Sequence, residues 1–401
     1  MAKHQLARRQ FIKTSSLGLM AGAFGIELKR HRRRSALDRI RVGVIGTGSR
    51  GRGLMELIIP QPEVEIVATC DIIPANLEAG LQLLDAQARG YIDYRDLLAR
   101  PDIDAVIIAT PLFQHFTMAK AAVEARKHVY LEKSLTYDIP QAIELARLVS
   151  ASPLVFQVGY QYRYYALYHT AKRILKEGAL GQITAIDCQY NRNSNWRNPC
   201  PDPALEKVIN WRLYREFCGG PLSELCAHQI DMVHYMLDAH PLTAVGLGGV
   251  NYWKDGRTTF DNIKTVYQYS NDMVVTYSSI LSNAFNGFML RLQGENATLE
   301  IQRDSMHLYA ERKENLKGLV DGVTGATLLN LTQGKPIEIP YWEKNKADIP
   351  EPTVTAISEF FRCIREKDQP LSNVENAKAT SIAVHMGNTA AETGMLQKWP
   401  V

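Results

Sequence analysis

The first half of the chain alternates short apolar runs with longer stretches of helical periodicity. The runs that predict strands cover residues 41–45, 64–70, 105–110, 128–131 and 154–158. The stretches that predict helices cover residues 51–59, 75–88, 116–126 and 139–148. Strands that are apolar throughout and separated by helices are typical of a parallel sheet covered on both faces. The pattern therefore predicts an α/β fold that begins with a doubly wound parallel sheet, a Rossmann domain over residues 39–160.

The second half has a different pattern, because its strand-like segments alternate in polarity and turn tightly. After a predicted helix over 165–176, these segments cover residues 183–190, 245–252, 263–269, 273–280, 288–292 and 298–301. Such alternation indicates a sheet with one covered face. We therefore expect an α+β domain over 161–401 with a large, mostly antiparallel open sheet. A Pro-rich stretch over 336–352 leads into two predicted helices, 354–365 and 376–393, which we expect to pack back on the body.

The first 38 residues differ from the rest. Arg8 and Arg9 precede an apolar run over 17–26, which is too short to span a bilayer. An arginine pair before a weakly apolar core is typical of a twin-arginine (Tat) export signal, here followed by a basic linker. We therefore expect a bacterial protein exported by the Tat machinery to the periplasm or beyond. A disordered basic tail remains an alternative. A retained anchor also remains open, because the small-residue site 21–23 lies inside the apolar run and cleavage is therefore uncertain.

This leader accounts for the basic net charge. Residues 1–34 hold nine of the 46 Lys and Arg and one of the 42 Asp and Glu, so 37 basic and 41 acidic residues remain. A body with a net charge of −4 offers no basic patch for nucleic acid. The 46% hydrophobic content of the whole chain predicts a globular protein with sizeable cores, and we expect no membrane span in the mature body. The six cysteines form no C-x-x-C pair, which argues against a zinc or redox motif. Cys200 and Cys218 could pair in an oxidising compartment, although unpaired core thiols are the simpler interpretation.

A glycine-rich loop follows the first predicted strand and precedes a helix. Its sequence from residue 46 is Gly-Thr-Gly-Ser-Arg-Gly, a dinucleotide fingerprint. Gly46 permits the tight turn, Gly48 lets the backbone approach a pyrophosphate, and Gly51 allows the helix to pack closely. Ser49 and Arg50 begin the helix whose N-terminus faces the phosphates, with Arg50 over the dinucleotide or, alternatively, in solvent.

Asp71 ends the second strand, where this fingerprint expects an acid on the adenosine ribose. Its carboxylate would repel a 2′-phosphate, so we expect NAD rather than NADP. A helix-capping role for Asp71 would be compatible with either cofactor.

Two further strand ends carry polar groups where ligands bind in doubly wound sheets. Thr110 and His115 follow the strand at 105–110, and Glu132 and Lys133 follow the strand at 128–131. A lysine beside an acid at such an edge can bind a substrate hydroxyl and ease its deprotonation. A surface ion pair is an equal alternative for Glu132 and Lys133.

One later helix has a polar stripe. At 100° per residue, Glu224, His228, Asp231 and Tyr235 fall within an arc of roughly 60°, opposite an apolar side. The stripe contains neither Lys nor Arg, unlike an ordinary surface helix, so we interpret it as part of a site. Its spacing matches no familiar metal-ligand set, so no metal is expected.

Together these residues resemble the glucose-fructose oxidoreductase and inositol dehydrogenase family (Gfo/Idh/MocA) over nearly the whole mature chain. The most specific part is the pairing of Glu132-Lys133 with the Gly-Gly turn at 219–220 and the helix that carries Glu224 and His228. The resemblance implies that Lys133 contacts substrate and nicotinamide ribose, and that His228 is the catalytic acid or base, assisted by Glu224. Two departures stand out: Ser134 replaces the proline usual after the lysine, and Glu224 replaces the commoner Asp.

The resemblance also implies a variable substrate wall. It covers residues 160–163 and 196–212, with Gln161 expected at the cofactor and Arg163, Trp211 and Arg212 at the substrate, together with Asp231 and Tyr235 from the helix. Aromatic and amide groups suit sugar rings.

The function that follows is hydride transfer from a sugar, glycoside or cyclitol hydroxyl to NAD. If the protein is exported, we expect tightly bound NAD that is recycled in place. Two alternatives remain open: a redox-neutral, NAD-dependent glycosidase of the α-N-acetylgalactosaminidase type, and a non-catalytic nucleotide-binding scaffold. The open sheet implies a homo-oligomer, because in this family that sheet commonly forms the subunit interface.

Overall fold

The structure is a computed structural model that describes residues 39–200, 202–311, 336 and 350–400. The predicted export signal lies outside these residues, as does most of the Pro-rich stretch at 336–352. The described residues from Ile40 onward belong to one compact unit.

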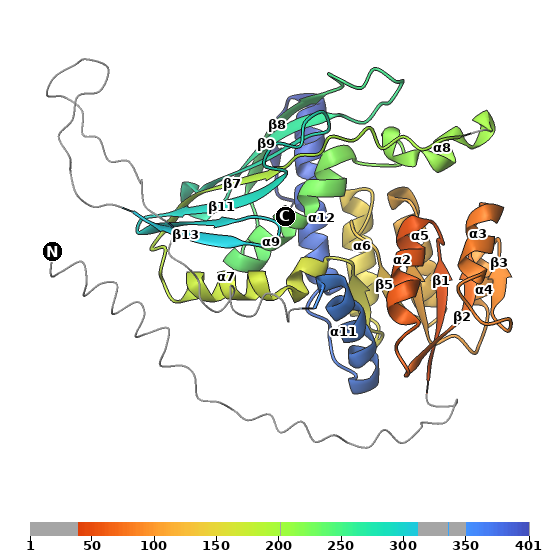
Figure 1. Cartoon of the computed structure of the whole chain (residues 1–401). Coiled ribbons are helices and arrows are strands. Elements are labelled where there is room, and N and C mark those ends of the chain that lie inside the picture. The colour runs from red at the N-terminus through yellow and green to blue at the C-terminus, as the bar shows by residue number, and fades with distance from the viewer. Residues whose placement is uncertain (1–38, 201, 312–335, 337–349, 401) are drawn as a thin grey trace, which may run out of the picture. The chain divides into compact units, whose positions relative to one another are not determined.

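A six-stranded parallel sheet forms the first layer, in the order β3-β2-β1-β4-β5-β6 (Figure 1). Its strands are β1 Ile40–Ile45, β2 Val64–Cys70, β3 Arg89–Tyr91, β4 Ala105–Ile108, β5 His128–Leu131 and β6 Phe156–Val158. Its helices are α2 Ser49–Ile58, α3 Pro74–Leu81, α4 Tyr94–Leu98, α5 His115–Glu124 and α6 Ile139–Ser150. The predicted Rossmann domain is confirmed. The sequence pattern missed β3 and α4, because both are very short and β3 has no buried residue.

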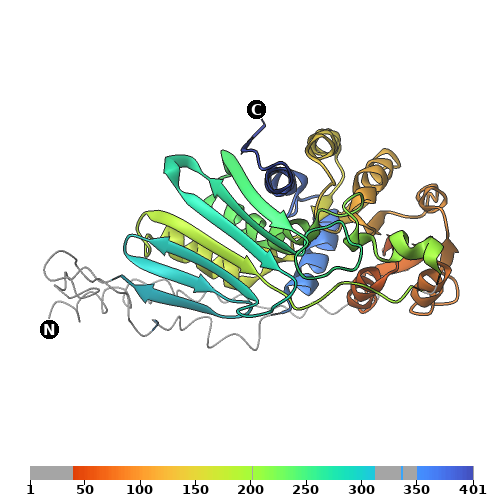
Figure 2. The same cartoon turned by 90° about the horizontal axis from the view of Figure 1, so that it is seen from above.

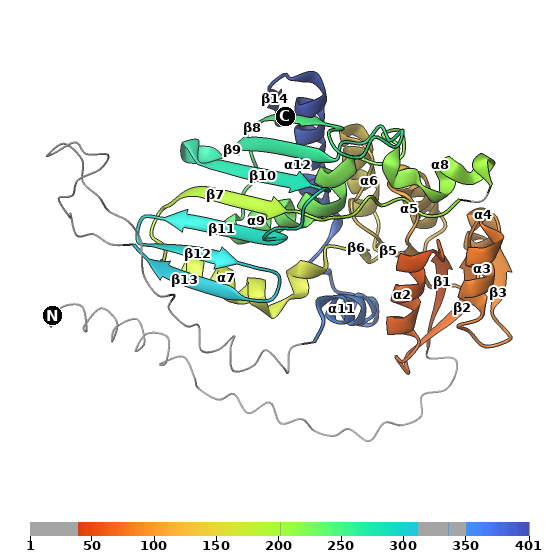
Figure 3. The same cartoon turned by 45° about the horizontal axis from the view of Figure 1, so that its top comes forward.

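The second sheet has eight strands in the order β13-β12-β11-β7-β10-β9-β8-β14 (Figure 3). They are β7 Ile183–Tyr190, β8 Thr243–Gly249, β9 Asn262–Gln268, β10 Val274–Ile280, β11 Phe288–Gly294, β12 Ala297–Ile301, β13 Met306–Ala310 and β14 Gln397–Lys398. The pair β7–β10 is parallel and the other pairs of this sheet are antiparallel. The sheet is therefore mixed, and it is mostly antiparallel as the sequence predicts. The longer helices of this half are α7 Ala166–Lys176, α9 Ala227–Leu237 and α12 Val374–Thr393.

The last two helices lie between the two sheets (Figure 2). Helix α12 contacts β8, α6 and α9, while α11 Pro352–Glu366 contacts α2. Phe360 and Phe361 of α11 share one buried cluster with Val42 and Leu54 of the parallel sheet and its helix. Helix α11 thus adds to the buried core beside the parallel sheet, although it belongs to the segment 161–401 that follows that sheet in the sequence.

Candidate active site

The glycine loop has the geometry that a dinucleotide requires. Gly46 has φ +91°, and a Cβ there would lie 2.7 Å from a backbone oxygen of the neighbouring strand end. A Cβ on Gly51 would lie 1.9 Å from the carbonyl oxygen of Gly46, so α2 packs directly on the loop. A Cβ on Gly48 would meet nothing closer than 4.0 Å, and Ser49 is the first residue of α2. The loop therefore leaves space in front of a helix N-terminus, which suits a pyrophosphate.

The carboxylate of Asp71 is fixed beside this loop. One oxygen accepts the amide of Thr47 at 2.9 Å, and the other accepts the amide of Ile73 at 2.8 Å. Both bonds leave lone pairs free, because a carboxylate has about four acceptor sites. At the end of β2, Asp71 can therefore accept further hydrogen bonds, and its contact with a ribose stays a prediction.

Arg50 has a partner that the sequence did not indicate. Its Nε donates to Oε1 of Glu132 at 2.8 Å, across the ends of β1 and β5. The Glu132 carboxylate is the main cause that raises the pKa of Arg50 further above its usual range. Gly159 makes room for this carboxylate, because a Cβ there would lie 3.1 Å from its Oε1. The ion-pair partner of Glu132 is thus Arg50. The sequence had suggested Lys133 as an alternative partner.

Lys133 instead reaches Glu224. The Lys133 ammonium donates to the backbone oxygen of Glu224 at 3.0 Å and lies 3.8 Å from its Oε1. Arg212, stacked over the ring of Trp211, donates its Nε to the other carboxylate oxygen at 2.8 Å. Burial by itself would raise the pKa of Glu224, but Lys133 and Arg212 bring it below its ordinary value. This side chain is therefore an ionised, 8% exposed carboxylate between two cations.

The segment that carries Glu224 is not the amphipathic α-helix that the sequence predicted. Residues Leu222–Cys226 form a π-helical turn, and α9 follows directly. Because a π-turn bonds five residues apart, a rotation of 100° per residue does not hold between Glu224 and His228. Nearly every residue of α9 is buried, so its polar side chains do not form an exposed stripe. Single π-turns inside helices occur often at functional sites.

His228 is 9% exposed and lies against two tyrosines. Its ring centroid is 5.0 Å from that of Tyr162 and 6.2 Å from that of Tyr160. Burial lowers the pKa of His228 well below its ordinary value, and the positive charges of Lys133 and Arg50 lower it further. The imidazole is therefore neutral near pH 7, which is the form that accepts a proton.

Asp231 belongs to a separate, sealed cluster. Its carboxylate accepts from Nε and Nη2 of Arg163 at 2.8–3.0 Å and from Oγ1 of Thr380 at 3.0 Å, and it is 0% exposed. The Arg163 guanidinium also lies 5.4 Å from the ring centroid of Tyr235. The sequence had assigned Asp231, Arg163 and Tyr235 to the substrate. The structure gives the first two a buried ion pair instead, because the partner comes from a segment 68 residues away.

Thr110 Oγ1, Gln161 Oε1 and His228 Nδ1 are among the buried polar atoms of this region that have no partner in the described residues. An unsatisfied buried polar group costs about 1–3 kcal/mol, so these atoms fit a polar ligand such as the nicotinamide half of a dinucleotide. His115 is already occupied, because its ring nitrogens lie 2.7 Å from the Ser134 oxygen and 3.0 Å from the Thr110 oxygen. It thereby links the ends of β4 and β5.

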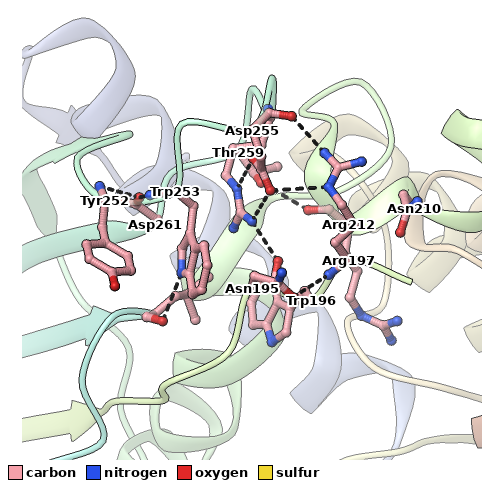
Figure 4. A network of polar contacts seen from close by, with 12 residues as sticks. Asn195, Trp196, Arg197, Asn210, Arg212, Tyr252, Trp253, Asp255, Thr259 and Asp261 are labelled. Atoms are coloured by element: carbon pink, nitrogen blue, oxygen red, sulfur yellow. Dashed lines mark hydrogen bonds and ion pairs between the residues drawn. The ribbon is translucent and has the colours of Figure 1, made fainter. Parts of the chain in front are cut away.

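A polar network holds the wall that carries Arg212 (Figure 4). The fully buried side chain of Arg257 donates to both carboxylate oxygens of Asp255, at 2.8 and 2.7 Å. Arg197 donates to the same carboxylate at 3.3 Å, and Thr259 donates to the backbone oxygen of Arg212 at 3.0 Å. The sequence did not indicate a role for Arg257 and Asp255, because the contacts that tie this pair to Arg197 and to the backbone of Asn195 span about 60 residues with no periodic pattern between them.

The cysteine thiols add little to the site. Cys200 and Cys218 are both free. Among the residues that the structure describes, no cluster of three His, Cys, Asp or Glu side chains could hold a metal, and no helix is long and apolar enough to cross a membrane.

Family models match most of the chain. Residues 40–160 match an oxidoreductase family with an NAD-binding Rossmann fold, and residues 172–394 match that family's C-terminal alpha/beta domain. An uncharacterized oxidoreductase of Synechocystis is 25% identical over 76% of this chain and 81% of that protein. Inositol 2-dehydrogenase of Salmonella typhimurium is 28% identical over 50% of this chain and 55% of its own length. With this and several other curated relatives, the chain thus spans about half of their length.

Solved structures share the fold. A levoglucosan dehydrogenase in complex with NADH superposes with a TM-score of 0.69 at 19% identity, covering 90% of this chain and 99% of that one. A scyllo-inositol dehydrogenase of Lactobacillus casei with bound NAD(H) and scyllo-inositol has a TM-score of 0.66 at 18% identity, covering 90% and 99%.

Proposed function

This chain belongs to the Gfo/Idh/MocA oxidoreductase family and carries its NAD(H)-binding Rossmann domain, and we propose that it oxidises a hydroxyl of a sugar, glycoside or cyclitol. When bound, NAD accepts the hydride from the carbinol carbon. The observation that carries the proposal is the meeting of Lys133, Glu224 and Arg212 near a neutral, buried His228. Relatives that are named for sugars and inositols support the substrate class.

The side chains divide the work as follows. His228 takes the proton of the substrate hydroxyl, because its lowered pKa keeps the imidazole neutral. Lys133 stabilises the developing alkoxide, and Glu224 holds the Lys133 ammonium in place from its backbone and side-chain oxygens. Arg212 fixes the second oxygen of Glu224 and presents Trp211 at the substrate wall. Gly46, Gly48 and Asp71 would hold NAD, whose 2′-hydroxyl suits the Asp71 carboxylate better than a 2′-phosphate would.

A direct experiment tests the function. The purified protein is denatured, any released nucleotide is identified by mass, and sugars and cyclitols are then titrated against native protein while NADH absorbance is followed. We expect NAD in the protein and its reduction by at least one polyol. A protein that neither retains nor binds NAD, or whose bound NAD no polyol reduces, contradicts the proposal.

We further propose that residues 1–38 direct Tat export, so that NAD stays bound and is reoxidised by a second substrate. Replacing Arg8 and Arg9 by Lys should retain the protein in the cytoplasm of its host, as judged by fractionation, with a cytoplasmic marker as control. Parallel initial-rate lines for two sugar substrates would support recycling in place. Secretion of the double variant at the normal level would refute Tat export. Intersecting initial-rate lines would refute the recycling of bound NAD.

A homo-oligomer through the open sheet is also proposed. Several apolar side chains of this sheet are exposed, Leu247 by 75% and Val245 by 42%. Light scattering of the purified protein should give a multiple of the chain mass, and Leu247→Asp should lower it. A wild-type monomer would exclude the assembly.

A further inference from the structure

A pocket of about 480 Å³ opens at the end of β7, outside the residues to which the proposed function gives a role. Its lining includes Arg192, Asn193, Phe288 and Arg303. Ligand pockets in proteins typically measure roughly 300–1,000 Å³, so this one can hold a sugar unit.

The charge of this pocket is one-sided. Arg192 and Arg303 both line it, whereas no Asp or Glu does. Arg192 donates to the Tyr190 hydroxyl at 3.1 Å, and within the described part of the chain neither arginine forms an ion pair with a carboxylate. Two arginines that form no ion pair with the described residues attract an oxyanion, which guanidinium groups bind through paired N–H donors.

The remaining lining suits a sugar. The ring centroids of Tyr190 and Phe288 lie 5.1 Å apart, and both rings line the pocket. The lining also contains the amides of Asn191 and Asn193 and the hydroxyl of Ser194. Apolar ring faces and hydroxyls of a pyranose match such a mixture of groups.

This pocket adjoins the reactive centre. Tyr162 lies with its ring centroid 5.0 Å from that of His228 and 6.0 Å from that of Phe288 in the pocket wall. Burial raises the pKa of Tyr162, and the charges of Arg303 and Arg192 act on the same hydroxyl in the opposite direction. One aromatic ring therefore separates the proposed base from the two arginines.

Resting on the function proposed above, we infer that the Arg192–Arg303 pocket is an anion subsite, and that the preferred substrate is an acidic sugar whose carboxylate or phosphate binds these two guanidinium groups. The hydroxyl to be oxidised then faces His228, while the anionic group is held on the far side of Tyr162. In this arrangement the two arginines favour acidic substrates over neutral ones, and neither Lys133 nor His228 takes part in that selection.

Binding and turnover are measured separately. Calorimetry on the NAD-loaded protein compares methyl glycosides of glucose, galactose and mannose with the matching uronates and hexose phosphates; NADH absorbance reports turnover of the same compounds. We expect at least one acid to bind more tightly than its neutral counterpart, and more weakly as salt is added. Preference for uronates over phosphates, or the reverse, identifies the oxyanion.

Variants locate the effect. Each of the single variants Arg192→Gln and Arg303→Gln should weaken binding of that acid about tenfold, and the double variant should weaken it about 100-fold. The affinity for the neutral sugar should stay unchanged in all three variants. Arg303→Lys should restore part of the affinity. Arg291→Gln is the control, because Arg291 lies on β11 but pairs with Glu300 outside the pocket.

The subsite is overturned if no acid binds more tightly than its neutral partner, or if the double variant weakens acid and neutral sugar equally. Tight acid binding that the double variant abolishes, without any reduction of NAD, would uphold the subsite and refute the oxidoreductase function. Turnover of neutral sugars without preference for acids would uphold the oxidoreductase function and refute the subsite.

Discussion

Glu224 and Asp231 are two carboxylates on one continuous helical segment, yet their surroundings differ. Glu224 lies in the π-turn between Lys133 and Arg212, close to the ends of the parallel strands. Asp231 lies two turns further on, fully buried against Arg163. The first pair places an ammonium where a substrate can reach it, whereas the second pair fastens α9 to the chain before α7.

The difference shows that an ionisable stripe on a helix has no single purpose. Lys133 is 12% exposed, so a ligand can still touch it, while Arg163 is 4% exposed and saturated by its partner. Removing a residue from the reactive pair should therefore affect turnover, and removing one from the sealed pair should affect folding.

The largest effect is expected at the sealed pair. Asp231→Ala leaves the Arg163 guanidinium buried without a counter-charge, which should lower the free energy of unfolding by about 3–5 kcal/mol. Urea unfolding of the NAD-loaded protein measures it. The double variant Asp231→Leu, Arg163→Met removes both charges and should recover most of the loss. A single variant as stable as wild type would show that the pair has no structural role.

At the reactive end, His228→Ala and Lys133→Ala should each lower turnover about 100-fold or more, because each removes a proton acceptor or an alkoxide partner. Bound NAD should stay in place, and unfolding should resemble that of wild type. Nucleotide content, NADH formation and urea unfolding are measured on the same preparation. Normal turnover in both variants would refute the assignment.

A smaller effect is expected at Glu224, which acts through Lys133. Glu224→Gln keeps the shape but removes the charge between Lys133 and Arg212, so kcat/KM should fall about tenfold, mainly through kcat. Glu224→Asp keeps the charge and should retain more activity. If Gln and Asp behave alike, the charge of this side chain does not matter.

The pH profile sharpens the role of His228 further. Since burial and the Lys133 charge lower the pKa of His228, kcat/KM should stay high until the pH falls below the ordinary histidine range, and should then decline as the imidazole is protonated. Lys133→Met removes one positive charge, so the decline of its residual activity should move to higher pH. An unmoved profile would show that another group titrates.

The smallest effect is expected at Tyr235, beyond Asp231 on the same helix. Tyr235→Phe keeps the ring that faces Arg163 and Lys172, so stability should change by less than about 0.5 kcal/mol, with KM unchanged. Steady-state kinetics and urea unfolding check this. A raised KM would restore Tyr235 as a substrate contact and would weaken the division between the two halves of the helix.

Much of the fold could be read from local pattern. Apolar runs such as Val64–Cys70 and His128–Leu131 coincide with strands, because a strand buried on both faces must be apolar throughout. Short elements such as β3 were missed, since three residues of which none is buried carry no period. The packing of α11 on the first domain was missed for another reason: its apolar face shows that it is covered, but not by what.

The sequence by itself determined the dinucleotide-binding domain and which ionisable side chains the candidate site contains. Glycines at 46, 48 and 51 and the acid at 71 act through backbone constraints and short-range spacing, which a sequence records directly. Only the tertiary structure decided which ionic groups pair: Arg50 with Glu132 across 82 residues, and Arg163 with Asp231 across 68. Periodicity reports which faces are buried, but the partner of a buried charge depends on how distant segments meet in space.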